Sequence, residues 1–558
     1  MAERPVPEAI ARLDLASIAD VGARQAIRAL LSLVEELAAE NQALRAENQQ
    51  LRDELTRLKG GSGRPKFPRG KASDGSTDYS SEQERRSAPK GWQKRGKQDR
   101  LRIDRTERVV VDPATLPADA VFKGYETVVV QDLVLRTDTV AFEQEVWYSP
   151  SERRSYRALR PAGYAGTFGP NLRALVLTLA YAGGMSERKI LELVQSAGIV
   201  ISTGTLSNLL TEGRVAFEPE AQAVLKAGLG SGPWQHLDDT STRVNGDGQY
   251  CHILCNPLYT AYQTTPGKDR LTVIDVLRGG RPRAYRFDQE ADRHLEFLGL
   301  SAAARAKLVA IPREQALDEA TLTALLAAPA LRLGPKQQDQ VREALALAAY
   351  LADPDWPVVR TLVCDDAPQF RAITEELALC WIHEGRHFKK LTPYLPQYRA
   401  ALADILAQFW DYYRDLPAYR EQPTPEACAR LDASFATLFG TKTGYQALDQ
   451  RLALTLDKKP ELLLVLDHPE LPLHNNPAEL GARQRVRKRD VSFGPRSPAG
   501  SAAWDTFMTL AATTRKLGID FGAFLRDRFT HAGQIPPLAD LITARAPQLS
   551  LGSSWTPA

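Results

Sequence analysis

Three carboxylates that lie far apart along the chain could act together on one substrate. Asp238 lies in the motif LDDT on the first of several predicted strands, Asp365 follows an apolar strand-like run over residues 358–364, and Glu479 lies at the start of a predicted helix. Carboxylate oxygens are the ligands that Mg²⁺ and other hard cations prefer. An acid on a first strand, an acid on a later strand and a glutamate on a late helix therefore suggest one shared site.

Each of these acids also has an ordinary structural explanation. Asn476 as N-cap, Pro477 at the first helical position and Glu479 at the third form a good capping signal, because a glutamate there can bond back to the amide of the cap residue. Acids at strand ends are commonly surface or turn residues. The Glu479 segment alone favours the cap, and it is the order of the three acids that favours a shared site.

Basic side chains follow Glu479 closely. They fit contacts with DNA phosphates beside the acids, although a solvated helix face explains the same pattern. The five cations within seven positions are Arg483, Arg485, Arg487, Lys488 and Arg489.

Two further groups contain residue types that bind metals. Cys380, His383 and His387 are close together on a predicted helix and could bind zinc, but no fourth ligand is evident, so zinc is not expected there. Cys251 and Cys255 would be separated by about 13 Å along a strand, which is too far for one ion. Core packing is the better explanation for that pair.

The segments before the acids predict two further units. Short β-type runs over residues 105–165 predict a small β-rich module without apparent chemistry. Residues 166–230 change to a helical period, and a helix, a glycine-containing turn and a third short helix are typical of helix-turn-helix geometry. Thr205, Ser207 and Asn208 are candidate base-reading residues in that interpretation. Packing of three helices without nucleic acid explains the pattern at least as well.

The N-terminal segment, residues 1–59, predicts a dimerising helix. Over residues 27–58 the apolar side chains fall into heptads, and asparagines at two a positions favour a parallel, in-register pair of helices. The alternative is one amphipathic helix packed on its own domain. The residues expected to dimerise are Leu30, Leu37, Asn41, Leu44, Asn48, Leu51 and Leu58.

Residues 60–104 follow as a predicted disordered, basic linker. Residues 59–105 contain 14 Lys or Arg and 6 Asp or Glu, while the whole chain has a net charge of only +3, so the remainder is net acidic. A flexible cationic tether suits contact with the phosphate backbone of DNA, and Arg64 and Lys66 lie in a sequence, GRPK, that weakly resembles a minor-groove AT-hook. Solvated linker charge is the alternative.

The motifs, in their order, resemble those of the bacterial DDE transposases of the insertion sequence 66 type. LDDT at 237–240 resembles the first-aspartate motif, and CDDAPQF at 364–370 the second. CWIHEGRHF at 380–388 resembles the segment after it, and HNNPAELGARQRVRKRDVSFG at 474–494 resembles the glutamate helix with its basic continuation. The N-terminal heptads fit the family as well.

This resemblance implies a multi-domain α/β chain with a ribonuclease H-like catalytic core over residues 231–500. The spacing of the acids requires helical insertions near 289–350 and 396–455, and a helical segment is expected over 501–558. By position, Asp238, Asp365 and Glu479 become the catalytic residues and the ligands of two Mg²⁺ or Mn²⁺ ions. The residues implied in DNA binding are Arg64, Lys66, Arg483, Arg487, Lys488 and Arg489.

Some positions depart from the family pattern. His474 stands where aspartate is usual, Gly385 where arginine is common, and Val491 where tryptophan is common, which affects substrate contacts more than metal binding. A zinc module between the heptads and the core is not expected, because the first cysteine is Cys251.

Composition narrows the class of protein. The 558 residues have 25% charged positions, a mean hydropathy of −0.31 and no apolar run of the ~18–20 residues that cross a bilayer. No secretory leader is visible, and five cysteines do not make a disulfide framework, so a cytoplasmic, nucleoid-associated protein is expected. The predicted function is metal-dependent cleavage and strand transfer on double-stranded DNA, by a homodimer or higher oligomer with small accessory proteins. The alternative is a catalytically silent DNA-binding regulator derived from a transposase.

Overall fold

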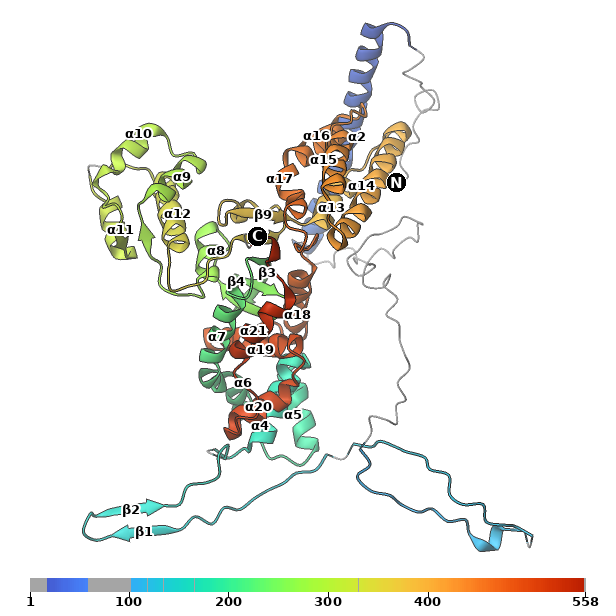
Figure 1. The fold of residues 1–558 in the computed structure, drawn as a ribbon, viewed down its shortest axis with the longest axis vertical. Helices are drawn as coiled ribbons and strands as arrows, with labels where there is room; N and C mark the ends of the chain where they lie inside the picture. Colours follow the sequence, from blue (N-terminus) through green and yellow to red (C-terminus); the bar gives the residue numbers. More distant parts are fainter. Residues whose placement is uncertain are drawn as a thin grey trace.

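The structure is a computed structural model that describes residues 18–58 and 102–555, apart from residues 118, 134, 165 and 330 (Figure 1). The predicted linker with Arg64 and Lys66 lies outside the described residues. The described chain is a mixed α/β protein with one five-stranded sheet and several groups of helices. Within this part of the chain, no helix combines the length and the apolar character needed to span a bilayer.

The five-stranded sheet has the order β5-β4-β3-β8-β9. Strands β3, β4 and β5 are antiparallel neighbours, whereas β8 pairs in parallel with β3 and β9 in parallel with β8. Asn245 and Gly246 join β3 to β4, and both have positive φ, as a tight hairpin turn requires. The strand bounds are β3 (Trp234–Val244), β4 (Asp247–Asn256), β5 (Tyr259–Thr265), β8 (Thr361–Cys364) and β9 (Glu376–Leu379).

Helices that precede β3 in the chain and helices that follow β9 both pack on the sheet. Helices α18 and α19 contact β3, β4 and β5, and α7 contacts β5, where Gly228 leaves room for the ring of Tyr259. A cluster of rings that includes Phe217, Phe507 and Phe529 joins this N-terminal helical group to α19 and α20. The helices are α4 (Pro170–Leu177), α5 (Glu187–Ser196), α6 (Thr203–Thr211), α7 (Glu218–Leu229), α18 (Asn476–Ser492), α19 (Pro498–Lys516), α20 (Phe521–Thr530) and α21 (Leu538–Arg545).

Two groups of helices come between strands of the sheet along the chain, and most of their helices are drawn away from the sheet in Figure 1. The second group has an aromatic core of its own, in which Trp381 contacts Phe409, Tyr412 and Phe435. The first group contains α8 (Arg270–Leu277), β6 (Tyr285–Arg286), α9 (Gln289–Phe297), α10 (Ala302–Arg305), β7 (Ala316–Leu317), α11 (Glu319–Leu326) and α12 (Pro335–Leu351); the second contains α13 (Trp381–Lys389), α14 (Pro396–Glu421), α15 (Pro425–Phe439), α16 (Gln446–Asp457) and α17 (Lys459–Leu462).

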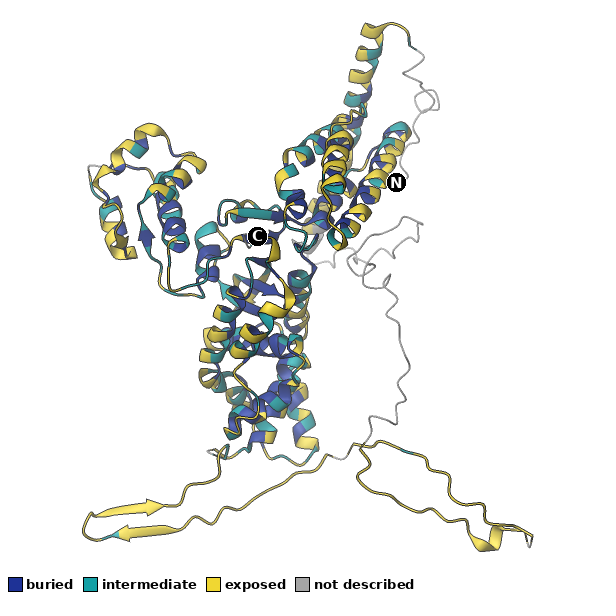
Figure 2. Ribbon diagram, viewed as in Figure 1, coloured by how far each residue is buried: buried dark blue, intermediate teal, exposed yellow. Residues whose placement is uncertain are grey.

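The N-terminal helix α2 (Val21–Leu58) packs on the second helical group through residues of its N-terminal half. Leu31 is buried in that group, and the carboxylate of Glu35 accepts hydrogen bonds from the backbone amides of Tyr394 and Leu395, just before α14. The heptad leucines Leu30, Leu37, Leu44 and Leu51 are exposed, and most of the free end of α2 is yellow in Figure 2. The side chain of Leu58 is not among those described.

The β-rich module predicted for residues 105–165 is reduced to a single hairpin. Strands β1 (Val146–Ser149) and β2 (Arg154–Arg157) pair with each other, and the other described residues of this segment are mostly extended chain without a sheet. The prediction of several strands is therefore wrong. Its alternating apolar side chains lack a face to pack on, so that Val109, for example, is 88% exposed.

Candidate active site

The register of the sheet brings Asp238 and Asp365 to the same level. In the parallel pair of β3 and β8, Trp234 lies opposite Thr361 and His236 opposite Val363. The same offset, continued by two residues, sets Asp365 opposite Asp238. Two carboxylates 127 positions apart in the sequence thus come from neighbouring central strands.

Glu479 reaches this region from the first turn of α18. The N-cap of α18 is Asn475, not Asn476, and its side chain makes no capping bond. Instead the buried Asn475 amide donates to the Leu237 carbonyl (2.7 Å), and its oxygen lies 3.0 Å from Nδ1 of His236. Asn475 therefore ties the start of α18 to the strand that carries Asp238.

The carboxylate of Glu479 does not serve as a helix cap. It accepts a hydrogen bond from Arg386 (3.3 Å) and lies 3.7 Å from Nδ1 of His383, both on α13. The capping explanation of Glu479 is therefore wrong, because its side chain faces another helix and not the cap amide.

The electrostatics of Asp238 reflect its neighbours. Burial, with repulsion from Asp365 and Glu479 in addition, raises the pKa of Asp238 from 3.8 to about 7, although the Asp239 amide donates to its Oδ1 (2.9 Å). Asp365 accepts a bond from the Ala367 amide (3.2 Å). Within the described chain, neither Asp238 nor Asp365 forms an ion pair. The negative charge of this site is therefore not compensated at the two aspartates.

The second acid of each aspartate doublet has protein partners. Asp239 lies 3.2 Å from Lys268 and accepts from Gln369 (3.3 Å). Asp366 pairs with Arg371 and, at 2.6 Å, with Lys458. The structure thus separates a structural acid from an uncompensated one in each doublet, which the motifs LDDT and CDDA do not do by themselves.

The cations of α18 divide into buried and exposed groups. Arg485 is buried and pairs with Asp505 (3.2 Å), and Lys488 is buried and donates to the Ala180 carbonyl (2.7 Å). Burial lowers the pKa of Lys488 to about 8. The ammonium of Lys488 is therefore not on the exposed face of α18. The exposed cations of this helix are Arg483 and Arg487.

Arg489 is intermediate in burial between the buried and the exposed cations of α18. It is half-buried, and its guanidinium donates to the Ser241 carbonyl on β3. It lines a hollow of about 760 Å³ together with Arg243 and Phe493.

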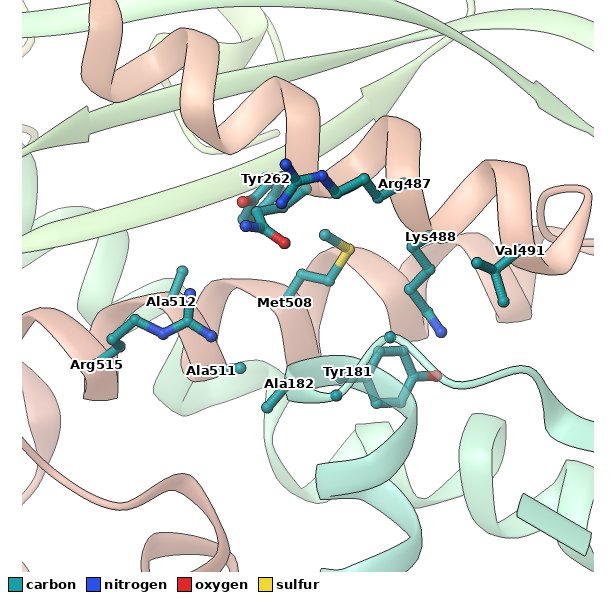
Figure 3. A pocket seen from close by; sticks show the side chains of 13 residues that line it. Tyr181, Ala182, Tyr262, Arg487, Lys488, Val491, Met508, Ala511, Ala512 and Arg515 are labelled. Atoms are coloured by element: carbon teal, nitrogen blue, oxygen red, sulfur yellow. The ribbon is translucent and has the colours of Figure 1, made fainter. Parts of the chain in front are cut away.

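A cationic pocket lies beside α18, about 390 Å³ in volume (Figure 3). Arg487 and Lys488 enter it from α18 and Arg515 from α19, around the side chain of Met508. No Asp or Glu is among its lining residues, although Glu187 is close enough to Lys488 to affect its pKa. The pocket therefore presents positive charge to an anion, and two of its cations come from the helix that carries Glu479.

The departure at Gly385 has a structural cause. A Cβ on Gly385 would lie 2.7 Å from the ring of Trp410, so no larger side chain fits there. The next residue, Arg386, supplies an arginine that reaches Glu479. Val491 is about half exposed and lines the cationic pocket.

Four residues near the acids were not predicted as part of the site: His236, Asn475, His383 and Arg386. His236 and Asn475 are buried and neutral, and burial lowers the pKa of His236 to about 3. The asparagine doublet before Pro477 was a possible signal. The contacts of His383 and Arg386 with Glu479 join residues more than 90 positions apart, for which the sequence carries no spacing rule.

Known proteins resemble this chain over the same region. The family described as "Transposase IS66 family" matches residues 165–286 and 337–503, which together are more than half of the chain and include all three acids. The match omits residues 287–336, where α9 to α11 lie.

A curated relative is similar along its whole length. It is the uncharacterized protein y4jO of Sinorhizobium fredii, which is 33% identical over 324 residues, or 58% of this chain and 100% of the relative. Together with the family match, this similarity shows that the chain belongs to the IS66 family of transposases.

Proposed function

We propose that this chain is a DNA transposase that cleaves strands at the ends of a bacterial insertion sequence and joins them to a target. Asp238, Asp365 and Glu479 are its catalytic residues and metal ligands. The observation that carries the proposal is the alignment of Asp238 with Asp365 across β3 and β8, together with a pKa of Asp238 that both Asp365 and Glu479 help to raise.

The sheet supports a ribonuclease H-like core. Three antiparallel strands, β3 to β5, come first, and β8 and β9 then join in parallel on the other side of β3. This order makes β3 and β8 neighbours, and α18 packs against β3 and β4. The three elements that carry the acids are thus adjacent.

The donor set fits Mg²⁺ or Mn²⁺. Both ions take carboxylate oxygens, and Mg²⁺ binds through few protein ligands and keeps several waters. The uncompensated charge of Asp238 and Asp365 is what a divalent cation would neutralise. Two such ions, when bound, would activate the attacking oxygen and stabilise the leaving oxygen.

The reaction proposed has two in-line displacements. A water oxygen first attacks phosphorus at the end of the element and releases a 3′-hydroxyl. The oxygen of that hydroxyl then attacks phosphorus in the target strand and displaces a 3′-oxygen. Asn475 holds the start of α18 against β3, so that Glu479 keeps its place relative to Asp238 in both steps.

The proposed partner is double-stranded DNA, namely the terminal inverted repeats and the target. Arg483 and Arg487 on the exposed face of α18 would contact phosphates near the acids, and Arg489 would do so from the hollow beside β3. Arg64 and Lys66 would add contacts from the linker. The exposed heptad leucines of α2 would hold the chain in a homodimer or higher oligomer. This assembly would act in the cytoplasm, at the nucleoid, together with small accessory proteins of the element.

The test is nicking of a plasmid that carries the terminal repeats, with Mg²⁺ and the full-length protein. Asp238→Asn, Asp365→Asn and Glu479→Gln should each lower nicking and strand transfer by about a thousandfold or more, because each removes a metal ligand. DNA binding, measured by footprinting, should be retained.

The matched controls are the neighbouring acids. Asp239→Asn and Asp366→Asn should keep most of the activity, since those carboxylates pair with Lys268 and with Arg371 and Lys458. Equal losses in both series would remove the assigned residues from the site. Footprints without nicking by the wild-type protein would favour the catalytically silent regulator.

A further inference from the structure

Three ligands of different chemistry meet between α13 and α18. One ligand atom each of Cys380, His383 and Glu479 lie within 4.8 Å of one another. The sequence suggested His387 as a partner of this cysteine and histidine, but the cluster takes Glu479 from another helix instead. The missing ligand is thus supplied by tertiary contact.

The three groups reach the cluster in different states. Cys380 is buried, and burial raises the pKa of its thiol from 9.0 to about 11, although the backbone amide of Asn475 donates to its sulfur (3.3 Å), so a bound cation has to displace the thiol proton. Nδ1 of His383 is buried and has no hydrogen-bond partner. The side chain of Glu479 is 12% exposed and lies 3.7 Å from that nitrogen. A sulfur, a nitrogen and an oxygen donor therefore converge with spare capacity.

This donor set selects a thiophilic cation. Zn²⁺ and its spectroscopic substitute Co²⁺ accept cysteine sulfur, histidine nitrogen and carboxylate oxygen together, whereas Mg²⁺ takes oxygen alone. Tetrahedral bonds of about 2.0–2.3 Å separate the donor atoms by roughly 3.3–3.8 Å, so the widest pair in the cluster has to contract by up to about 1.5 Å. Three protein ligands leave the fourth position to water.

In this structure the guanidinium of Arg386 supplies the positive charge beside Glu479 and His383. Its guanidinium donates to Glu479 (3.3 Å) and lies 3.0 Å from Nε2 of His383, and its side chain is 44% exposed. A dication and a guanidinium repel each other at such distances, so Arg386 would turn toward solvent when the ion binds.

We propose that Cys380, His383 and Glu479 form a binding site for Zn²⁺ or a similar thiophilic cation, which competes with Arg386 for Glu479. The ion withdraws Glu479 from the carboxylate triad and so inhibits the Mg²⁺-dependent reaction. Binding stands on the cluster alone, whereas inhibition rests on the proposed function.

The binding experiment is a titration of the full-length, Mg²⁺-free protein with Co²⁺. We expect one equivalent to bind, with the thiolate-to-cobalt charge-transfer band and the visible bands of a tetrahedral ion. Cys380→Ser should abolish the charge-transfer band, and His383→Ala and Glu479→Gln should weaken binding at least about tenfold. Arg386→Ala should tighten binding instead, since it removes a competing positive charge.

Two control variants test the site. His387→Ala, one turn further along α13 and outside the cluster, and Cys428→Ser, a half-buried thiol elsewhere, should leave the titration unchanged. A wild-type spectrum without the charge-transfer band, or a band that survives Cys380→Ser, would overturn the site.

The coupling is read as the ratio of plasmid nicking without and with one equivalent of Zn²⁺ at fixed Mg²⁺. We expect this ratio to be at least fivefold for the wild-type protein. Excess Mg²⁺ should lower the ratio, and the Cys380→Ser variant should have a ratio near one. Cobalt binding with a ratio of one would overturn the inhibition. A wild-type protein that binds cobalt but never nicks DNA would contradict the proposed function and leave the site standing.

Discussion

At the scale of single residues, the pKa of Asp238 makes the proposed site sensitive to pH. The carboxyl titrates near pH 7 in the folded chain, mainly because it is buried and also because Asp365 and Glu479 repel its charge. Cation binding needs the deprotonated form, so the Mg²⁺ concentration for half-maximal nicking should fall as pH rises from 6 to 8. Asp239→Asn should show the same profile as the wild type, and a flat profile in the wild type would contradict the assignment.

The same shift fixes the sign of a stability effect. Since the folded pKa of about 7 exceeds the ordinary 3.8, the folded chain holds a proton that the unfolded chain releases, and metal-free stability should fall between about pH 4 and 7. Thermal unfolding in chelator should therefore show a smaller loss over this range for Asp238→Asn than for the wild type. An equal loss in both proteins would mean that Asp238 is ionised throughout.

The contacts around the proposed site were only partly predictable. Asp238, Asp365 and Glu479 could be selected because their order along the chain follows a motif. The partners that distinguish Asp238 from Asp239, such as Lys268 and Gln369, come from other elements and leave no trace in local spacing. Burial of Lys488 was equally hidden, because a run of cations looks the same whether it faces solvent or the ring of Tyr181.

At the scale of elements, Gly481 controls how closely α18 approaches the sheet. A Cβ on Gly481 would lie 2.7 Å from Cγ2 of Ile253, which is the cross-strand partner of Asp238 and lies on the same face of the sheet. Gly481→Ala should therefore push α18 outward, cost about 1–3 kcal/mol of stability and lower Mg²⁺-dependent nicking several-fold. Chemical denaturation and the nicking assay measure the two effects.

The matched control for this change is Gly204→Ala on α6. It adds the same methyl group to a helix, but no atom lies within 4 Å of the new Cβ, so stability should stay the same or increase. A Gly481→Ala, Ile253→Ala double variant should lose less stability than the sum of the losses in the two single variants. Full additivity would show that the two side chains do not compete for space.

Elements could be predicted where local pattern and tertiary packing agree. The strand before Asp365 was visible as an apolar run because β8 is buried throughout. The start of α18 was misplaced by one residue, since Asn475 uses its side chain for β3 and not for its own helix. The sequence over residues 105–165 alternates as strands do, but the residues of this range that the structure describes form one hairpin and no larger sheet, which no local pattern could reveal.

At the scale of the whole molecule, α2 carries two separate surfaces. Leu31 and Glu35 attach it to the second helical group, while the heptad stripe on another side stays open, with Leu30 at 61% and Leu44 at 49% exposure. Packing on its own chain thus uses one side of α2, and the proposed pairing with a second copy would use the other side. The side chains of Asn41 and Asn48 donate to Leu37 and Leu44 carbonyls of their own helix in the single chain.

This division predicts an assembly defect without a folding defect. Leu37→Asp with Leu44→Asp should convert a dimer into a monomer, because two charges would enter the seam at d positions, while Gln42→Asp, outside the stripe, should not. Sedimentation equilibrium measures the mass, and thermal unfolding of the core should be unchanged because neither leucine is in a buried cluster. Strand transfer needs two element ends at once, so the monomeric variant should nick single ends but should not form products in which both ends are joined to a target. A double variant that stays dimeric would place the interface outside α2.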